Sequence, residues 1–258
     1  MAGNYDAIVI GTGFGGSVAA CRLAQAGLRI SVLERGRRYD IHEFPRDWNN
    51  PLNGWLWETG QGLFDVKSLQ QMTVVQSAGL GGGSLIYANV HLRAPEAVFA
   101  QGWPAGYRRA ALDPYYDLVA YMLDINPITK SSRGLPTKTR FMREVADQLH
   151  RLDQFCYPNI AVDFGPETPH LNKFEAEQRG CHYCGECDIG CNFHAKNTLD
   201  FNYLKVARDF GADISTQCEA TRIEPAVAGG YKVTYLEHAA GGRFASSKLV
   251  TYSCAREP

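Results

Sequence analysis

The first part of the chain alternates between short apolar runs and a glycine-rich turn. Asp6–Ile10 is mostly β-branched or small, as in a strand buried on both faces. Phe14–Ala26 carries apolar residues at helical spacing, and Gly27 follows as a C-cap. Arg29–Leu33 is a second short apolar run. We therefore predict a strand–helix–strand unit whose two strands pair in parallel.

The middle of the chain is less regular. Gly36 to about Thr73 is rich in Trp, Pro, Asn and Gly without sustained periodicity, and we predict an irregular segment over the domain surface. Between Ala94 and Arg151 the pattern is helical in parts. One helix is predicted to begin at Asp113-Pro114, with proline in its first turn, and another to cover Lys138–Leu152.

The last part of the chain is predicted to be a helix followed by a β-meander. The helix covers Leu199–Phe210 and ends at Gly211. Two glycine pairs, 229–230 and 241–242, mark turns between short strand-like runs. The predicted strands lie near Ile214–Gln217, Glu219–Glu224, Tyr231–Glu237 and Phe244–Thr251.

Composition excludes several classes of protein. The chain of 258 residues is 45% hydrophobic and 21% charged with a net charge of −1, and its basic residues are scattered, so no nucleic-acid partner is predicted. Ala7–Ala24 is apolar but rich in glycine, with no basic flank or cleavage site. We therefore expect no transmembrane segment and a cytoplasmic protein.

The first motif is Gly11-Thr-Gly13-Phe14-Gly15-Gly16, between a predicted strand and a predicted helix. These glycines allow a tight turn, close approach of a pyrophosphate and close packing of helix on strand. Glu34 ends the next strand and is placed to accept hydrogen bonds from a ribose. Arg35, Arg37 and Arg38 raise the alternative of a 2′-phosphate and NADP, which the glutamate would repel.

The second motif is the loop Ser77–Asn89, Ser-Ala-Gly-Leu-Gly-Gly-Gly-Ser-Leu-Ile-Tyr-Ala-Asn. Together with the first motif it resembles the glucose–methanol–choline (GMC) oxidoreductases, and in particular their bacterial cholesterol-oxidase-like branch. The resemblance implies FAD as cofactor, with Gly82, Gly83 and Ser84 along the pyrophosphate and flavin. It also implies that Asn89 lies near the isoalloxazine ring and that Ala220 lies against the adenine. Many family members carry Asn where this chain has Tyr87.

The resemblance also implies the fold class. This is an α/β, FAD-binding Rossmann-like fold, doubly wound around a mostly parallel sheet, with a β-meander and an inserted helical substrate or cap region. We predict the first part of the FAD-binding domain over residues 1–95 and the substrate region over 96–180. A cysteine cluster over 181–195 precedes the second part of the FAD-binding domain over 196–258. The fold is expected to be incomplete.

Four cysteines within eleven residues form the third motif. Cys181, Cys184, Cys187 and Cys191 have the C-x2-C-x2-C-x3-C spacing of bacterial ferredoxins. An iron–sulfur cluster is one interpretation. A structural zinc site and unligated thiols that pack a turn are the alternatives.

The resemblance implies an FAD-dependent oxidase or dehydrogenase that transfers hydride from a CH–OH group of an alcohol, with sterols as one candidate class, to flavin N5. An electron acceptor is a further expected partner. Family members use a His/Asn or His/His pair near the C-terminus and are about twice as long, so the catalytic half is expected to be missing and no catalytic residue is assigned. A flavin- or cluster-binding fragment without turnover and an NAD(P)-dependent reductase are the alternatives.

Overall fold

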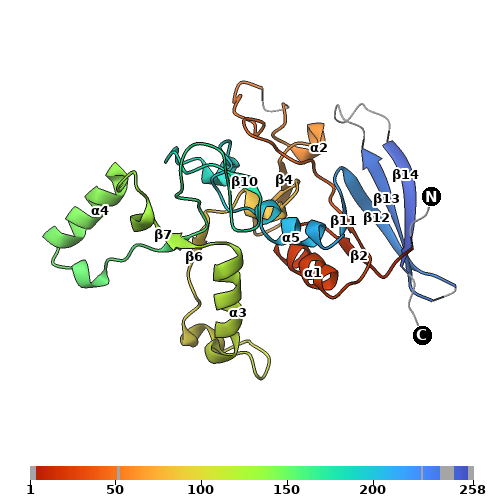
Figure 1. Cartoon of the computed structure of the whole chain (residues 1–258), viewed down its shortest axis with the longest axis horizontal. Helices are drawn as coiled ribbons and strands as arrows, with labels where there is room; N and C mark the ends of the chain where they lie inside the picture. The colour runs from red at the N-terminus through yellow and green to blue at the C-terminus, as the bar shows by residue number, and fades with distance from the viewer. Residues whose placement is uncertain (1–3, 51–52, 228, 239–246, 255–258) are drawn as a thin grey trace.

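The computed structural model describes residues 4–50, 53–227, 229–238 and 247–254 (Figure 1). Its helices are α1 Phe14–Gln25, α2 Trp57–Gly60, α3 Arg109–Met122, α4 Thr137–Gln148 and α5 Tyr203–Asp209. Its strands are β1 Asn4–Tyr5, β2 Ala7–Ile10, β3 Ile30–Leu33, β4 Phe64–Ser68, β5 Thr73–Ser77, β6 Val90–His91, β7 Asn126–Pro127, β8 Asn159–Ile160, β9 His170–Leu171, β10 Glu177–Gln178, β11 Asp213–Ser215, β12 Cys218–Pro225, β13 Tyr231–His238 and β14 Ser247–Cys254.

The predicted strand–helix–strand unit is confirmed. Strands β2 and β3 pair in parallel, with Ala7 opposite Ile30, and α1 connects them. A Cβ on Gly16 would lie 1.9 Å from the carbonyl oxygen of Gly11 and 3.4 Å from a methyl of Val9. The absence of a side chain at position 16 is therefore what lets α1 start this close to β2.

Strand β11 belongs to the parallel sheet, whereas its sequence region was predicted as the first strand of the meander. It pairs in parallel with β3, with Asp213 opposite Ser31, and the sheet order is β11-β3-β2. The sequence of β11 does not indicate its partner, because paired parallel strands are separated by a long connection in the chain.

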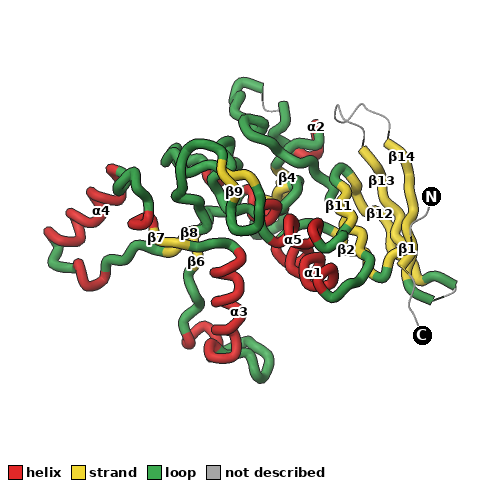
Figure 2. Tube along the Cα trace, viewed as in Figure 1, coloured by secondary structure: helices red, strands yellow, loops and turns green. Residues whose placement is uncertain are grey.

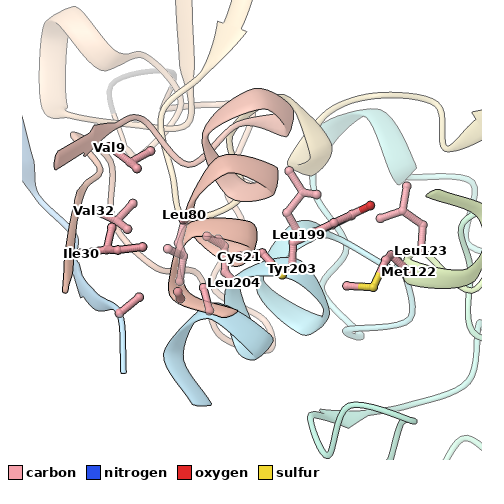
Figure 3. Close-up of a cluster of buried hydrophobic side chains, with 14 of the residues drawn as sticks. Val9, Cys21, Ile30, Val32, Leu80, Met122, Leu123, Leu199, Tyr203 and Leu204 are labelled. Atoms are coloured by element: carbon pink, nitrogen blue, oxygen red, sulfur yellow. The ribbon is translucent and has the colours of Figure 1, made fainter. Parts of the chain in front are cut away.

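Three layers result from this arrangement (Figures 1 and 2). Helices α1 and α5 pack together on one face of the parallel sheet, where Val9, Ile30 and Val32 join the largest buried cluster (Figure 3). The opposite face carries Leu33, which packs against Cys218, Val233 and Tyr235 of the meander. The described sheet is therefore covered by helices on one face and by strands on the other, and the predicted mixed α/β fold with a parallel sheet is confirmed.

The meander itself is confirmed for the described residues. Strands β12, β13 and β14 are antiparallel neighbours, and β1 adds to β14 in parallel, with Tyr5 opposite Cys254. The predicted turn at Gly229-Gly230 joins β12 to β13. The predicted turn at Gly241-Gly242 and the predicted strand residues 244–246 lie outside the described residues.

Several predicted element boundaries in the middle of the chain are wrong. Helix α3 begins at Arg109, so Pro114 lies inside it rather than in its first turn. Salt bridges from Arg109 and Arg93 to Asp113 support the turn before the proline. The segment predicted as irregular contains α2 and β4, which pairs with β5 as a hairpin with mostly exposed or half-buried side chains.

The helix predicted over 199–210 is broken at Asn202. A 3-10 turn over Leu199–Phe201 precedes α5, and Asn202 has φ −138° and ψ −89°. Its side-chain oxygen accepts from the Tyr203 N–H at 2.8 Å, and its amide donates to the Thr198 carbonyl at 2.8 Å. This side chain therefore satisfies backbone groups on both sides of the break.

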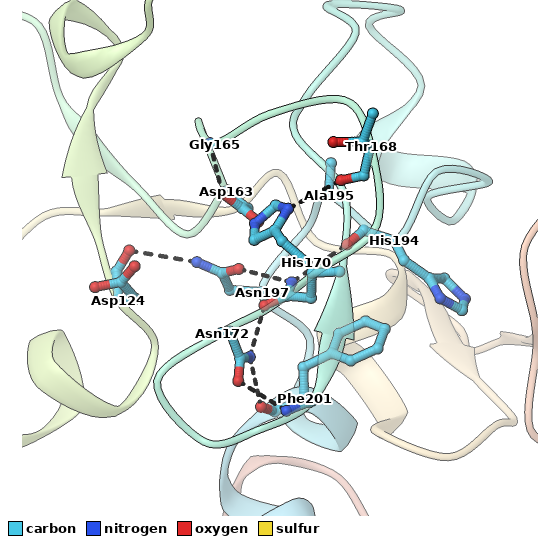
Figure 4. A network of polar contacts seen from close by, with 12 residues as sticks. Asp124, Asp163, Gly165, Thr168, His170, Asn172, His194, Ala195, Asn197 and Phe201 are labelled. Carbon is cyan, nitrogen blue, oxygen red and sulfur yellow. Dashed lines mark hydrogen bonds and ion pairs between the residues drawn. The ribbon is translucent and has the colours of Figure 1, made fainter.

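A network of carboxamides links the end of α3 to β10 and to the segment that precedes α5 (Figure 4). Asn197 donates to the carbonyl of Leu123 at the end of α3 and accepts from Gln178. Asn172 donates to Gln178 and to the carbonyl of Phe201. Helices α3 and α4 extend away from this network, at the far side of the molecule from the meander (Figures 1 and 2). In the described part of the chain, no helix has both the length and the apolarity needed to cross a membrane.

Candidate functional site

A cavity of about 810 Å³ opens where β2 and β3 end. It is bounded by the turn after β2, the end of β3, the β4–β5 hairpin, the second glycine loop and the start of β12. Of the predicted cofactor residues, the structure brings together in its lining Gly11, Gly13, Glu34, Arg35, Gly82, Gly83 and Ala220. The cavity lies at the carboxyl ends of parallel strands, the usual place for a ligand in an α/β sheet.

The start of α1 faces this cavity with unused backbone donors. The N-cap is Gly13, which has no side-chain capping hydrogen bond, and the first turn holds no acidic residue. The first N–H groups of a helix have no partner within it and favour an anion. Phe14 and Gly15 contribute such N–H groups, although neither residue is in the cavity lining.

Glu34 is engaged within the protein. Its Oε2 accepts from the Thr12 N–H at 2.9 Å and from the Thr12 hydroxyl at 2.6 Å, and its Oε1 accepts from the Gly36 N–H at 2.9 Å. The carboxylate is 4% exposed and lines the cavity. Each carboxylate oxygen can accept two hydrogen bonds, so Oε1 retains room for a hydroxyl. A ribose contact at Glu34 stays a prediction.

Thr12 is a site residue that the motif analysis did not single out. Its hydroxyl donates to Glu34 and accepts from the Gly81 N–H at 3.0 Å, and its side chain is fully buried. The first motif and the second glycine loop are thereby joined through one side chain. Its position between two motif glycines was visible in the sequence, but its second partner is 69 residues away.

Arg35 is held by an ion pair at the edge of the cavity. Its guanidinium lies 2.8 Å from Asp65 and 5.0 Å from the ring centroid of Trp57. Burial raises the pKa of Asp65, but hydrogen bonds from Arg35 and Lys67 outweigh it and hold the pKa below its usual 3.8. Arg35 therefore already has a carboxylate partner within the chain.

Besides Phe14, Gly15 and Gly16 of the first motif, the predicted cofactor residues Ser84 and Asn89 lie outside the lining. The Ser84 hydroxyl is buried, where it donates to the Gly81 carbonyl at 2.8 Å and accepts from the Leu199 N–H at 3.1 Å. The Ser84 hydroxyl therefore joins the second glycine loop to the backbone at Leu199. Asn89 is 4% exposed and has a φ of 54°. Neither Ser84 nor Asn89 is in the cavity lining, and their predicted place along the cofactor stays a prediction.

Tyr87 is an aromatic residue of the cavity lining. Its hydroxyl lies 3.0 Å from His91 Nε2, and its ring meets the edge of Phe14 at 5.4 Å. Burial raises the pKa of Tyr87 and lowers the pKa of His91, so both side chains are neutral at neutral pH. The sequence showed only that Tyr87 departs from the Asn of other family members.

A buried lysine lies close to Tyr87. Lys196 is 1% exposed, and its ammonium donates to the main-chain oxygens of Leu85, Tyr87 and Cys187. It also lies 4.5 Å from the ring centroid of Tyr87. Burial lowers the pKa of Lys196 to about 8, which leaves it mostly protonated at neutral pH. The sequence offered no signal for this role.

The comparison with protein-family models matches this chain to the GMC oxidoreductases over residues 5–254. The chain belongs to the GMC oxidoreductase family. The resemblance stated from the two glycine motifs is thereby confirmed. FAD is the cofactor of this family.

Two bacterial cholesterol oxidases are among the relatives of this GMC oxidoreductase. It is 36% identical over 232 residues to a cholesterol oxidase of Mycobacterium tuberculosis, covering 83% of this chain and 39% of that protein. It is 30% identical over 237 residues to a cholesterol oxidase of Acinetobacter baumannii, covering 86% and 42%. The chain thus spans about two fifths of the length of these relatives.

More distant matches include a plant enzyme and solved structures. A long-chain-alcohol oxidase of Arabidopsis thaliana is 30% identical over 220 residues, covering 84% of this chain and 26% of that protein. A formate oxidase structure from Aspergillus oryzae is 15% identical with a TM-score of 0.48, covering 100% of this chain and 45% of that one.

The cavity of this GMC oxidoreductase fits the cofactor of its family. Its volume lies within the range of about 300–1,000 Å³ that ligand pockets occupy. A Cβ on Gly13 would meet no atom within 4 Å, so the backbone there is open to a ligand. The donors at the start of α1 suit a pyrophosphate, and Ala220 lies in the lining beside Glu34 and Arg35. Which atoms of FAD each residue contacts stays a prediction.

The four cysteines of the third motif are not arranged as a metal site. Among the residues that the structure describes, no group of three or more His, Cys, Asp or Glu side chains could hold a metal ion. The thiol of Cys181 accepts from a backbone N–H, and burial raises its pKa to about 11, while Cys184 is exposed. Metal ligation needs thiolates that converge on one point. The predicted iron–sulfur cluster at Cys181, Cys184, Cys187 and Cys191, and the zinc alternative, therefore find no support.

Proposed function

We propose that this chain binds FAD across the cavity as part of an enzyme that oxidises the CH–OH group of an alcohol. The ADP half would lie over the turn from β2 to α1, with the ribose toward Glu34 and the adenine toward Ala220. The flavin would lie toward Gly82, Gly83 and Tyr87. Bound FAD supplies a hydride acceptor, which none of the side chains can replace.

The convergence of the two glycine loops carries this proposal. A Cβ on Gly82 would lie 2.6 Å from the Gly13 Cα, and the Thr12 hydroxyl accepts from Gly81 N–H. Backbone from both loops thus borders one cavity, and a dinucleotide can contact both loops at once. Nicotinamide binding by an NAD(P)-dependent reductase would need only the first loop, so the second loop favours FAD.

A sterol is the substrate class that we propose first. Its support is the identity of 36% and 30% to proteins named cholesterol oxidases. The long-chain-alcohol oxidase match supports a broader class, apolar alcohols.

A second candidate function is that of a flavin-binding piece with no turnover of its own. It is favoured because the chain spans only 39% and 42% of the cholesterol oxidases that it matches. The absence of alcohol oxidation by the FAD-loaded chain, with FAD tightly bound, would support this second function.

The test is an anaerobic absorption spectrum of the purified chain, followed by identification of the released cofactor. Flavin bands and released FAD are the expected result. Gly13→Ala should fold with unchanged urea stability, since its Cβ meets no atom within 4 Å, but should bind FAD at least tenfold more weakly. A folded chain that binds a nicotinamide dinucleotide and no flavin would overturn the proposal.

A further inference from the structure

Lys196 is a buried positive charge at the flavin end of the proposed cavity. It is 1% exposed, and its three hydrogen-bond acceptors are neutral main-chain carbonyls. Over the described ranges of the chain, no carboxylate forms an ion pair with it. Burying an ammonium without a counter-charge is costly, and neutral dipoles repay only part of that cost.

The charge lies directly behind the cavity wall. Two of its acceptors, Leu85 and Tyr87, follow the glycines of the second loop, and the ring of Tyr87 lines the cavity. The ammonium lies 4.5 Å from the centroid of that ring. Tyr87 therefore borders both the ammonium and the cavity, and the field of a buried charge this close to the lining acts on a ligand bound there.

An opposite charge lines the same end of the cavity. Asp188 is an exposed residue of the cavity lining, next to Cys187, whose carbonyl accepts from Lys196. A ligand at this end would therefore lie between a buried cation and an exposed anion.

We propose that Lys196 is a positioning residue that stabilises the reduced flavin over the oxidised flavin, and that Asp188 opposes it. Hydride transfer adds two electrons and one proton to a flavin, so the ring gains one negative charge, and the hydroxyl proton of the alcohol leaves separately. A cation near the ring favours that added charge and an anion disfavours it. This inference rests on the proposed binding of FAD.

The test measures the dissociation constants of the chain for oxidised FAD and, under anaerobic reducing conditions, for reduced FAD. Their ratio, oxidised over reduced, reports the stabilisation of the reduced flavin. Lys196→Met should lower this ratio about tenfold, which corresponds to a midpoint potential about 30 mV lower for a two-electron couple. Lys196→Arg retains the charge and should keep the ratio within about threefold of the parent chain.

Asp188→Asn should change the ratio of dissociation constants in the opposite direction, and it replaces no buried side chain. Because Asp188 is exposed, this variant should fold as the parent does, and its ratio should rise. If Lys196→Met binds oxidised and reduced FAD more weakly by the same factor, the ratio is unchanged and Lys196 only holds the loop. An unchanged ratio would overturn the inference. If Lys196→Met does not fold, Asp188→Asn decides: a raised ratio supports the inference and an unchanged ratio overturns it. A parent chain that binds neither form overturns the proposed function first.

Discussion

Gly82 lies directly against Gly13, so that a Cβ at position 82 would stand 2.6 Å from the Gly13 Cα and 2.8 Å from its nitrogen. Gly82 also has a φ of +51°. Two loops that are 69 residues apart thus meet backbone to backbone at the proposed cofactor cavity. The two loops can approach this closely because Gly82 has no side chain.

Gly82→Ala should destabilise the chain by about 2 kcal/mol or more, because the new Cβ meets backbone atoms and the positive φ strains an alanine. Urea unfolding without added FAD measures this loss. Gly83→Ala is the matched control, since its Cβ would find only the Phe14 ring at 4.0 Å, and its effect should stay within about 0.5 kcal/mol. Equal losses in the two variants would contradict the contact.

Gly16→Ala should cost about 3 kcal/mol or more, because its Cβ would lie 1.9 Å from the Gly11 carbonyl oxygen and force α1 away from β2. Gly15→Ala, one residue earlier in the same helix, meets no atom within 4 Å. Its stability should be unchanged or higher by up to about 1 kcal/mol, since alanine favours a helix. Thermal unfolding followed by circular dichroism compares the two. A stable Gly16→Ala chain would show that α1 does not pack as described.

Thr12→Val should destabilise the chain by about 1–3 kcal/mol, because the Gly81 N–H loses its acceptor and Glu34 loses one donor in a buried place. Thr12→Ser keeps the hydroxyl and should recover most of this stability. The measurement is the free energy of unfolding in urea. If serine were no better than valine, the loss would come from packing of the methyl group instead.

Asp65→Asn should lower stability at pH 6, because the 2% exposed carboxylate forms ion pairs with both Arg35 and Lys67. Its folded pKa is below the usual 3.8, so its contribution is present above that value. The contribution is lost as pH falls from 3.8 through the folded pKa. The difference in unfolding free energy between parent and variant should therefore shrink below about pH 4.

Lys67→Gln is the control for that series. Lys67 is 48% exposed, so its removal should cost at most about 1 kcal/mol and leave the pairing of Arg35 with Asp65 in place. A difference between parent and Asp65→Asn that is constant from pH 6 to pH 3 would show that the carboxylate charge is not what stabilises the site.

Local patterns predicted what depends on neighbours in the chain. The strand–helix–strand unit with Gly11 and Gly16, and the antiparallel strands β12 and β13, follow from short-range hydrophobic spacing and from turn residues. The same patterns placed the two glycine motifs at one cofactor site and indicated the family. Periodicity could not show that Pro114 lies within α3, because side-chain pairs such as Arg109 with Asp113 decide that boundary.

What only the tertiary structure decided are pairings between distant residues. Strand β11 pairs with β3 in the parallel sheet, and the Thr12 hydroxyl accepts a hydrogen bond from the Gly81 N–H. Asp65 forms an ion pair with Arg35, and the buried Lys196 ammonium lies near the Tyr87 ring. The type of a residue does not identify a partner tens of residues away, because burial and hydrogen bonding are determined only when the loops pack together. The cysteines show the same limit: spacing placed four thiols near one another along the chain, but the fold determines where each thiol points.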